Sequence, residues 1–337
     1  MTEKNYGGSA PFRKQSKENK PASKEAALLK VNKKEREKIK TQEPETEKEK
    51  ILKAGKIAAE IRKYAKEIIK KEVPLLEIAE KLETKITELG GKPAFPLNLS
   101  INEIAAHYTP LHDDTARAHG LLKVDIGVHI DGLIADSALT IDLENTEENK
   151  KLIKAAEEAL ENAIKILNPE VSLNIIGKTI QETIESYGFS PIVNLSGHSM
   201  EKYDLHAGIT IPNIDNNQER KIGTGLFAIE PFSTTGGGKV SDGKPSNIYQ
   251  LVEEKNIRSP LAREILNYII TEYRTVPFCE RWLYKKFGAR AIIALKQLEE
   301  NGNLHQFPQL VESTKNKVAQ AEHTILIDKE TKVTTRD

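Results

Sequence analysis

Residues 123–140, KVDIGVHIDGLIADSALT, alternate apolar and polar side chains on both sides of an Asp-Gly pair at 131–132. An Asp-Gly pair flanked by alternating apolar residues is a strong signal for a hairpin with a two-residue turn. With this turn, Gly127 pairs with Asp136 across the hairpin. Because alternate residues of a strand share a face, Asp125 and Asp136 then lie on the same face as diagonal neighbours.

The two faces of this predicted hairpin differ in character. Two carboxylates on one face repel each other, and they lose hydration if they are buried, so a bound cation would relieve them. Ordinary surface charges on a hairpin that faces solvent are the alternative, and the hairpin alone leaves it open. The opposite face is apolar and is expected to pack into the body of the protein: Val124, Ile126, Val128, Ile130, Leu133, Ala135 and Leu139.

Further carboxylates and histidines follow in strand-like or loop segments. SGHSMEKYDLHAG contains His198 and His206, GLFAIEPF contains Glu230, and AQAEHTILI contains Glu322. Four carboxylates with one or two histidines and no thiolate suit Mn, Fe, Co or Zn. Their four negative charges would be balanced by two divalent ions, which is an arrangement used for metal-assisted hydrolysis.

The remaining pattern predicts an α+β fold with antiparallel sheet. Apolar residues at helical spacing predict two pairs of helices, each followed by strands, and a further helical segment late in the chain. The predicted helices are 51–72, 74–89, 145–167 and 172–187, and the late helical segment is 259–303. The further predicted strands are 191–196, 205–211, 225–231 and 318–328.

The N-terminal part has a different composition from the rest. The chain has 337 residues with no formal net charge, yet residues 1–50 contain 14 Lys and Arg against 9 Asp and Glu. This part has almost no aromatic residues and is predicted to be disordered. It would act either as a solubilising arm or as an electrostatic contact to RNA or the ribosome.

Composition also bears on the compartment. The chain has one cysteine, Cys279, which fits a reducing environment. The first 30 residues contain no apolar stretch typical of a signal peptide, and no segment has the roughly 20 apolar residues of a membrane span. A cytoplasmic location is therefore expected.

Five motifs of the chain resemble those of type II methionine aminopeptidases, and of archaeal members in particular. They are AFPLNLSINEIAAHYTP, LLKVDIGVHIDGLIADSALTID, SGHSMEKYDLHAG, GLFAIEPF and AEHTILI. The resemblance begins at about residue 48 and runs to the C-terminus. It implies the pita-bread fold for residues 49–337, after a disordered charged extension over residues 1–48. It also implies a helical insertion at about 257–305, where TVPFCERWL is typical of type II.

The resemblance assigns roles to particular residues. His107, His206 and Glu230 would be catalytic, and both histidines would also contact the substrate. Phe95 and Leu205 would line the pocket for the methionine side chain. Two divalent ions, of an identity that the resemblance does not specify, would be held by Asp125, Asp136, His198, Glu230 and Glu322, with Asp136 and Glu322 bridging them.

The implied activity is removal of the initiator methionine from nascent proteins whose second residue is small. The partners would be nascent N-termini, with a ribosome contact through the basic tail; the protein would be a monomer without membrane or DNA partners. Two alternatives use the same fold: a non-catalytic relative that binds RNA and proteins, and a prolidase-like peptidase. The first would have lost metal ligands and the second would carry a separate N-terminal domain. All five predicted ligands are present here.

Other reactive groups are expected to be structural. His129 shares a face with Asp125 but matches no role in the resembling family. His323 should point away from Glu322, because neighbouring residues of a strand face opposite sides. His112, His119 and His305 are expected to lie on the surface, and Gly236–Gly238 is expected to form a flexible loop. Cys279 is not expected to act as a nucleophile.

Overall fold

The computed structural model describes residues 45–336. The predicted extension, residues 1–48, therefore lies almost wholly outside the described residues. The first described element is α2 (Glu47–Ile68), which begins slightly before the predicted boundary. Its N-cap Thr46 accepts a hydrogen bond from the Glu49 N–H, and the Glu49 side chain accepts one from the Thr46 N–H. This reciprocal capping box explains why the helix begins here.

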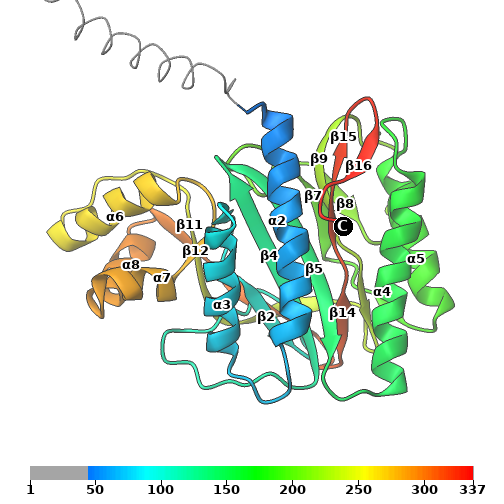
Figure 1. Cartoon of the computed structure of the whole chain (residues 1–337), viewed down its shortest axis with the longest axis horizontal. Helices are drawn as coiled ribbons and strands as arrows, with labels where there is room; N and C mark the ends of the chain where they lie inside the picture. Colours follow the sequence, from blue (N-terminus) through cyan, green and yellow to red (C-terminus); the bar gives the residue numbers. More distant parts are fainter. Residues whose placement is uncertain (1–44, 337) are drawn as a thin grey trace, which may run out of the picture. The chain divides into compact units, whose positions relative to one another are not determined.

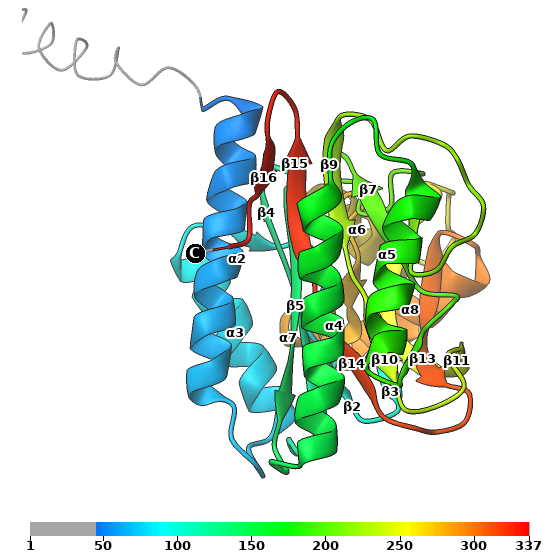
Figure 2. The same cartoon turned by 90° about the vertical axis from the view of Figure 1, so that its right-hand side faces the viewer.

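Two pairs of helices cover the sheets, as predicted. α2 and α3 (Leu75–Glu88) lie side by side on one flank, and α4 (Glu147–Ile166) and α5 (Leu173–Ser186) lie on another (Figures 1 and 2). Thr146 caps α4 as expected, by accepting a hydrogen bond from the Asn149 N–H. α2 ends earlier than predicted, because the chain turns before α3 through Glu72, which has a φ of 69°.

The hairpin is formed by β4 (Leu121–Ile130) and β5 (Leu133–Asp142). Its register confirms the prediction: Gly127 pairs with Asp136. Most of the predicted apolar face packs beneath α2 and α3, but Leu133 does not. Leu133 follows the turn directly and joins a different cluster, which contains Phe95. β4 also pairs with β1 (Lys92–Pro93) and β2 (Asn98–Ile101).

A second antiparallel sheet lies beneath α4 and α5, with the strand order β16-β15-β9-β7-β8. The predicted strand 205–211 is wrong over most of its length, because the chain there is mainly turn. The predicted strand 318–328 is divided in two, with Glu322 between β14 and β15. The strands of this region are β7 (Ser196–Met200), β8 (Thr210–Pro212), β9 (Gly225–Ile229), β14 (Val318–Gln320), β15 (His323–Ile327) and β16 (Thr331–Val333).

The late helical segment contains three helices, α6 (Pro260–Glu272), α7 (Glu280–Phe287) and α8 (Arg290–Glu300). They cluster beside a sheet with the order β12-β11-β13-β3, on the side of the fold away from α4 and α5 (Figure 1). A small sheet, β14-β10-β6, completes the α+β architecture. The strands not yet given are β3 (Ile104–Ala106), β6 (Ser190–Pro191), β10 (Phe232–Thr234), β11 (Val240–Leu251), β12 (Phe278–Cys279) and β13 (Leu304–Glu312). Among residues 45–336, no helix is both long and apolar enough to cross a membrane.

Candidate active site

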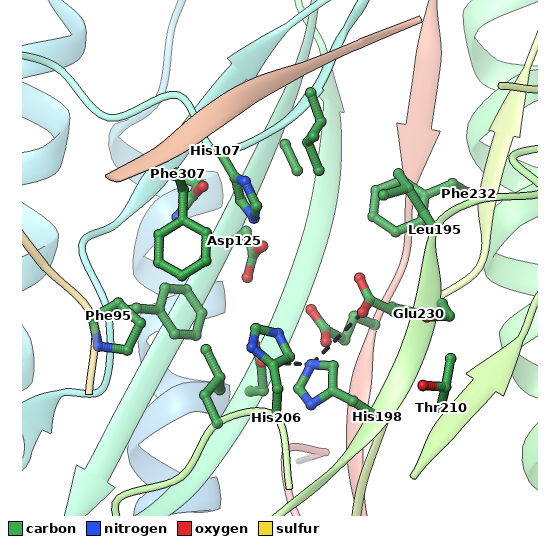
Figure 3. A pocket seen from close by; sticks show the side chains of 18 of the residues that line it. Phe95, His107, Asp125, Leu195, His198, His206, Thr210, Glu230, Phe232 and Phe307 are labelled. Carbon is green, nitrogen blue, oxygen red and sulfur yellow. Dashed lines mark ion pairs between the residues drawn. The ribbon is translucent and has the colours of Figure 1, made fainter. Parts of the chain in front are cut away.

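A cavity of about 320 Å³ lies where the sheets meet, and every residue predicted for the site lines it. Figure 3 shows Phe95 and His107 on one side of a central group of carboxylates, with Leu195, Thr210 and Phe232 on the other. The sequence predictions therefore converge on one place in the fold. The predicted residues on its wall are Phe95, His107, Asp125, Asp136, His198, Leu205, His206, Glu230 and Glu322.

Five of these residues form what we call the carboxylate–histidine cluster: Asp125, Asp136, His198, Glu230 and Glu322. Each comes from a different segment, namely β4, β5, β7, the end of β9 and the link between β14 and β15. The His198 Nε2 lies 3.6 Å from the Asp136 Oδ2 and 3.7 Å from the Glu230 Oε1. Ligand atoms of Asp136, His198 and Glu322 all lie within 4.8 Å of one another.

The cluster concentrates negative charge away from water. Loss of hydration raises the pKa of Asp125 to about 7. The same cause, together with repulsion between the neighbouring carboxylates, raises the pKa values of Asp136, Glu230 and Glu322 well above their usual range. Burial lowers the pKa of His198 to about 3, so its ring is neutral and keeps a lone pair for a cation.

Unpaired acceptor atoms in the cluster test whether the site suits a metal. The Asp125 Oδ1, the Asp136 Oδ1 and the Glu322 Oε2 are buried and have no hydrogen-bond partner. Such orphaned acceptors are costly in a folded protein unless a cation satisfies them. Oxygen donors with one imidazole nitrogen also match the ligands of Mn, Fe, Co and Zn. The residues present therefore fit divalent metal ions.

A set of residues that the sequence analysis missed holds the cluster from behind. Thr324 donates its hydroxyl to the Asp136 carbonyl and accepts from the Asp136 N–H, both at 2.7 Å. Arg62, on α2, donates to the Ser137 hydroxyl at 2.8 Å and to the Glu322 carbonyl at 3.3 Å. These bonds tie β5 to the segment of Glu322.

Gln320, the last residue of β14, also supports the cluster. Its Nε2 lies 3.5 Å from the Glu230 Oε2. Its amide also holds down the pKa of Asp125, against the larger effect of burial. Gln320 precedes Glu322 by two residues, and residues two apart in an extended segment share a face. That spacing was the sequence signal that could have identified it.

His107 has a defined protonation state and tautomer. Burial lowers its pKa to about 4, so the ring is neutral near pH 7. Its Nδ1 lies 3.1 Å from the Pro308 carbonyl oxygen, which can only accept, so the Nδ1 carries the hydrogen. The Nε2 is then a hydrogen-bond acceptor. His206 is exposed at the cavity and its ring centroid lies 4.4 Å from that of His198.

Apolar side chains form one wall of the cavity. Phe95 and Leu205 lie there as predicted, and both are buried. Phe307, from β13, was not predicted; its ring meets that of His107 edge-on, with centroids 5.6 Å apart. A Cβ at Gly127 would lie 2.3 Å from the Phe95 ring, so the glycine makes room for that ring.

The remaining histidines lie outside the cavity lining. The His129 Nδ1 accepts from the Gly132 N–H, and the His323 Nδ1 pairs with the Thr335 hydroxyl. His119 and His305 are exposed, as predicted. The surface prediction for His112 was wrong in part, because its ring stacks on that of Tyr284 at 3.4 Å and is half-buried.

Two further predictions concern Cys279 and the glycine loop. Cys279 is buried, and burial raises the pKa of its thiol to about 12, so it is not a nucleophile. The loop Gly236–Gly238 is anchored rather than loose, since the Gly237 N–H donates to the buried carboxylate of Glu312 at 2.9 Å.

Comparisons with known proteins agree with this geometry. The model of metallopeptidase family M24 matches residues 49–329. Methionine aminopeptidase of Methanocaldococcus jannaschii is 49% identical over 282 residues, which is 83% of this chain and 95% of that protein. Methionine aminopeptidase of Pyrococcus abyssi is 47% identical over 296 residues, which is 86% of this chain and 99% of that protein.

Solved structures share the fold. The crystal structure of methionine aminopeptidase from Thermotoga maritima matches with a TM-score of 0.63 at 24% identity, over 88% of this chain and 98% of that one. The predicted pita-bread fold is thereby confirmed. The match of the family model to most of the chain, together with relatives almost half identical to it, shows that the chain belongs to metallopeptidase family M24 and, within it, to the methionine aminopeptidases.

Proposed function

We propose that this chain is a type II methionine aminopeptidase, which removes the initiator methionine from nascent proteins whose second residue is small. The observation that carries the proposal is the carboxylate–histidine cluster, with its orphaned acceptor atoms, beside an apolar wall in one cavity. The type II assignment is supported by the helices α6 to α8, which occupy the position expected for the type II insertion.

As a member of a metallopeptidase family, the protein uses divalent metal ions. We assign their binding to Asp125, Asp136, His198, Glu230 and Glu322, which would hold them through carboxylate oxygens and one imidazole nitrogen. When bound, such ions provide Lewis acidity and lower the pKa of a water molecule toward neutrality. Four carboxylates match the charge of two divalent ions.

The other residues bind and orient the peptide. Phe95 and Leu205 would hold the methionine side chain, whose burial provides binding energy. The His107 Nε2, as an acceptor, is suited to an N–H group of the substrate next to the first peptide bond. His206 would donate to the carbonyl oxygen of that bond and stabilise its developing charge. Glu230 would carry the proton to the leaving amine.

The preference for a small second residue is supported by the size of the cavity. Its volume of about 320 Å³ must hold a methionine side chain and the reacting water as well as the following residue. A large second side chain would compete for the same space. This limit concerns the residue after the scissile bond, so it would act on the cleavage of peptides and not on the binding of free methionine.

The proposed partners and location follow from the substrate. We propose that the chain acts as a monomer in the cytoplasm on emerging N-termini, without membrane or DNA partners. A reduced, buried Cys279 is compatible with a reducing compartment. The excess of positive charge in residues 1–50 supports an electrostatic contact to the ribosome.

The test is metal-dependent release of methionine from Met-Ala-Ser. The protein is stripped with chelator and reconstituted separately with Mn, Co, Fe or Zn. Asp136→Ala should abolish the restored activity, whereas Asp131→Ala, an exposed aspartate in the turn of the same hairpin, should retain it. Cleavage of X-Pro dipeptides instead would support a prolidase-like peptidase, and a folded wild type inactive with every metal would support a non-catalytic relative.

A further inference from the structure

A buried ion pair joins the late helical segment to the helix α3. Glu83, on α3, and Arg281, on α7, are 9% and 2% exposed. The guanidinium donates two hydrogen bonds to the carboxylate, from Nη1 to Oε2 at 2.7 Å and from Nη2 to Oε1 at 2.8 Å. This two-point geometry gives a strong and directional contact, which lysine does not reproduce.

The other bonds of this pair lead to two segments of the cavity wall. The Glu83 Oε1 accepts from the Leu97 N–H at 3.3 Å. Leu97 follows Phe95 by two residues and precedes Asn98 directly, and both Phe95 and Asn98 line the cavity. The Arg281 Nε donates to the Pro110 carbonyl at 2.9 Å. The Arg281 Nη2 also lies 3.4 Å from the Thr109 hydroxyl. One ion pair thus holds the segment that follows Phe95 and the segment that follows His107.

His107 is the residue for which such anchoring has most effect. Its φ of 65° lies in the left-handed region, which a histidine adopts only where the surroundings enforce it. The Pro308 carbonyl holds the ring, while the Arg281 bonds hold the chain just beyond it. The wall that contacts substrate is therefore fixed by groups that do not themselves reach the cavity.

We propose that Glu83 and Arg281 are positioning residues, which set the placement of Phe95 and His107 and so the alignment of the substrate. The inference rests on the proposed function, since it concerns how that substrate is held. It assigns the late helical segment a role in substrate alignment. The ion pair does not touch the carboxylate–histidine cluster, so metal binding should be independent of it.

The chain offers a matched control and a built-in reporter. Glu80 and Lys285 join the same two helices at 2.9 Å; Lys285 is exposed and Glu80 is partly exposed. Glu80 adds only a minor charge effect on Arg281, and within residues 45–336 neither Glu80 nor Lys285 has a hydrogen bond to the two segments of the cavity wall. Trp282 is the one tryptophan of the sequence, and its Nε1 donates to the Glu83 Oε2 at 2.9 Å. Tryptophan emission therefore reports directly on the environment of the buried pair.

The experiment compares the metal-loaded wild type with Glu83→Gln, Arg281→Lys and Glu80→Gln. The readouts are kcat and KM on Met-Ala-Ser, bound metal per chain, and tryptophan emission. We expect Glu83→Gln and Arg281→Lys to lose about ten- to hundredfold in kcat/KM, the scale for a reacting group misplaced by up to an ångström. Both should keep the metal content of the wild type and show shifted emission, and Glu80→Gln should match the wild type.

Each other outcome is informative. The proposal is overturned if the folded variants of the buried pair match Glu80→Gln in kcat/KM, or if they lose bound metal, which would make the pair a support of the cluster. An uncompensated buried charge can prevent folding, and Glu83→Gln leaves such a charge on Arg281. If that variant does not yield folded protein, the result for Arg281→Lys, which retains the positive charge, tests the proposal. An inactive wild type would instead refute the proposed function itself.

Discussion

Replacing Asp125 by asparagine should have opposite effects on stability with and without metal. In the metal-free protein, loss of hydration raises the pKa of Asp125 from 3.8 to about 7. The folded state then binds a proton more tightly than the unfolded state. The stability that this tighter proton binding contributes to the folded state is complete below pH 3.8 and is lost as the pH rises through about 7. Asparagine resembles the protonated acid and does not titrate.

The size of the effect follows from the same two values. The interval from 3.8 to about 7 corresponds to about 4 kcal/mol, and because Asp125 is partly exposed to the cavity, screening reduces it to roughly 2–4 kcal/mol. Metal-free Asp125→Asn should gain this much stability relative to wild type between about pH 4 and pH 7.5. The buried histidines titrate in both proteins, so their effects cancel in the difference. The neighbouring carboxylates do not cancel: beyond the effect of burial, the Asp125 charge raises the pKa values of Asp136, Glu230 and Glu322, so its removal adds to the gain in the same direction. With metal bound, the sign should reverse, because the variant lacks a ligand.

Urea unfolding of both proteins across this pH range, with chelator and with added Mn, measures the difference. Asp131→Asn is the matched control, since Asp131 is exposed in the turn of the same hairpin and has a φ of 49°, which asparagine tolerates. A difference between Asp125→Asn and wild type that does not change with pH in chelator would refute the reasoning. So would an unchanged sign after metal is added.

Three further predictions test other parts of the site and fold. Glu230→Gln should lower kcat on Met-Ala-Ser by about 10²–10⁴-fold; a variant with wild-type kcat would remove Glu230 from proton transfer. Gly127→Ala places a Cβ 2.3 Å from the Phe95 ring, so KM for methionyl peptides should rise; an unchanged KM would show that Phe95 does not bind the methionine side chain. Gly55→Ala places a Cβ 2.2 Å from the Thr334 carbonyl oxygen, so it should lower the free energy of unfolding, measured in urea, by roughly 1–3 kcal/mol. A variant as stable as the wild type would contradict this tight contact between α2 and the C-terminal segment.

The hairpin was predictable because a two-residue turn leaves only one register, so the pairing of Gly127 with Asp136 follows from local sequence. β11 was not predicted. Its outer part is polar, and its pairing with β13 shifts register on both sides of Pro245, so no alternation survives. The segment around Leu205 contains alternating residues but turns back on itself, with Glu201 paired to Asp204. Local pattern does not distinguish such a turn from a strand.

The residues predicted for the site share a property: each lies in one of the five distinctive motifs of the sequence. Of the supporting residues, Thr324 lies in one of these motifs, whereas Arg62 and Phe307 do not. Arg62 and Thr324 act through backbone atoms of distant segments, and Phe307 lies in a strand far along the chain from the residues that it faces. The contact between Glu83 and Arg281 spans 198 positions. Such pairings arise from the packing of separate elements, and a single sequence contains no periodic signal for them.

The distribution of the carboxylate–histidine cluster over five segments also has a kinetic consequence. Only Asp125 and Asp136 are near each other along the chain, and Glu322 comes almost 200 residues after the first of them. Bringing such distant segments together is slow, because the entropy of closing long loops is lost before the contacts form. Tight metal binding then has to follow assembly of the sheet that contains β7, β9 and β15, since three of the five residues of the cluster lie in or beside these strands. Metal should accordingly slow unfolding while leaving the folding rate almost unchanged, since it stabilises contacts that form after the transition state.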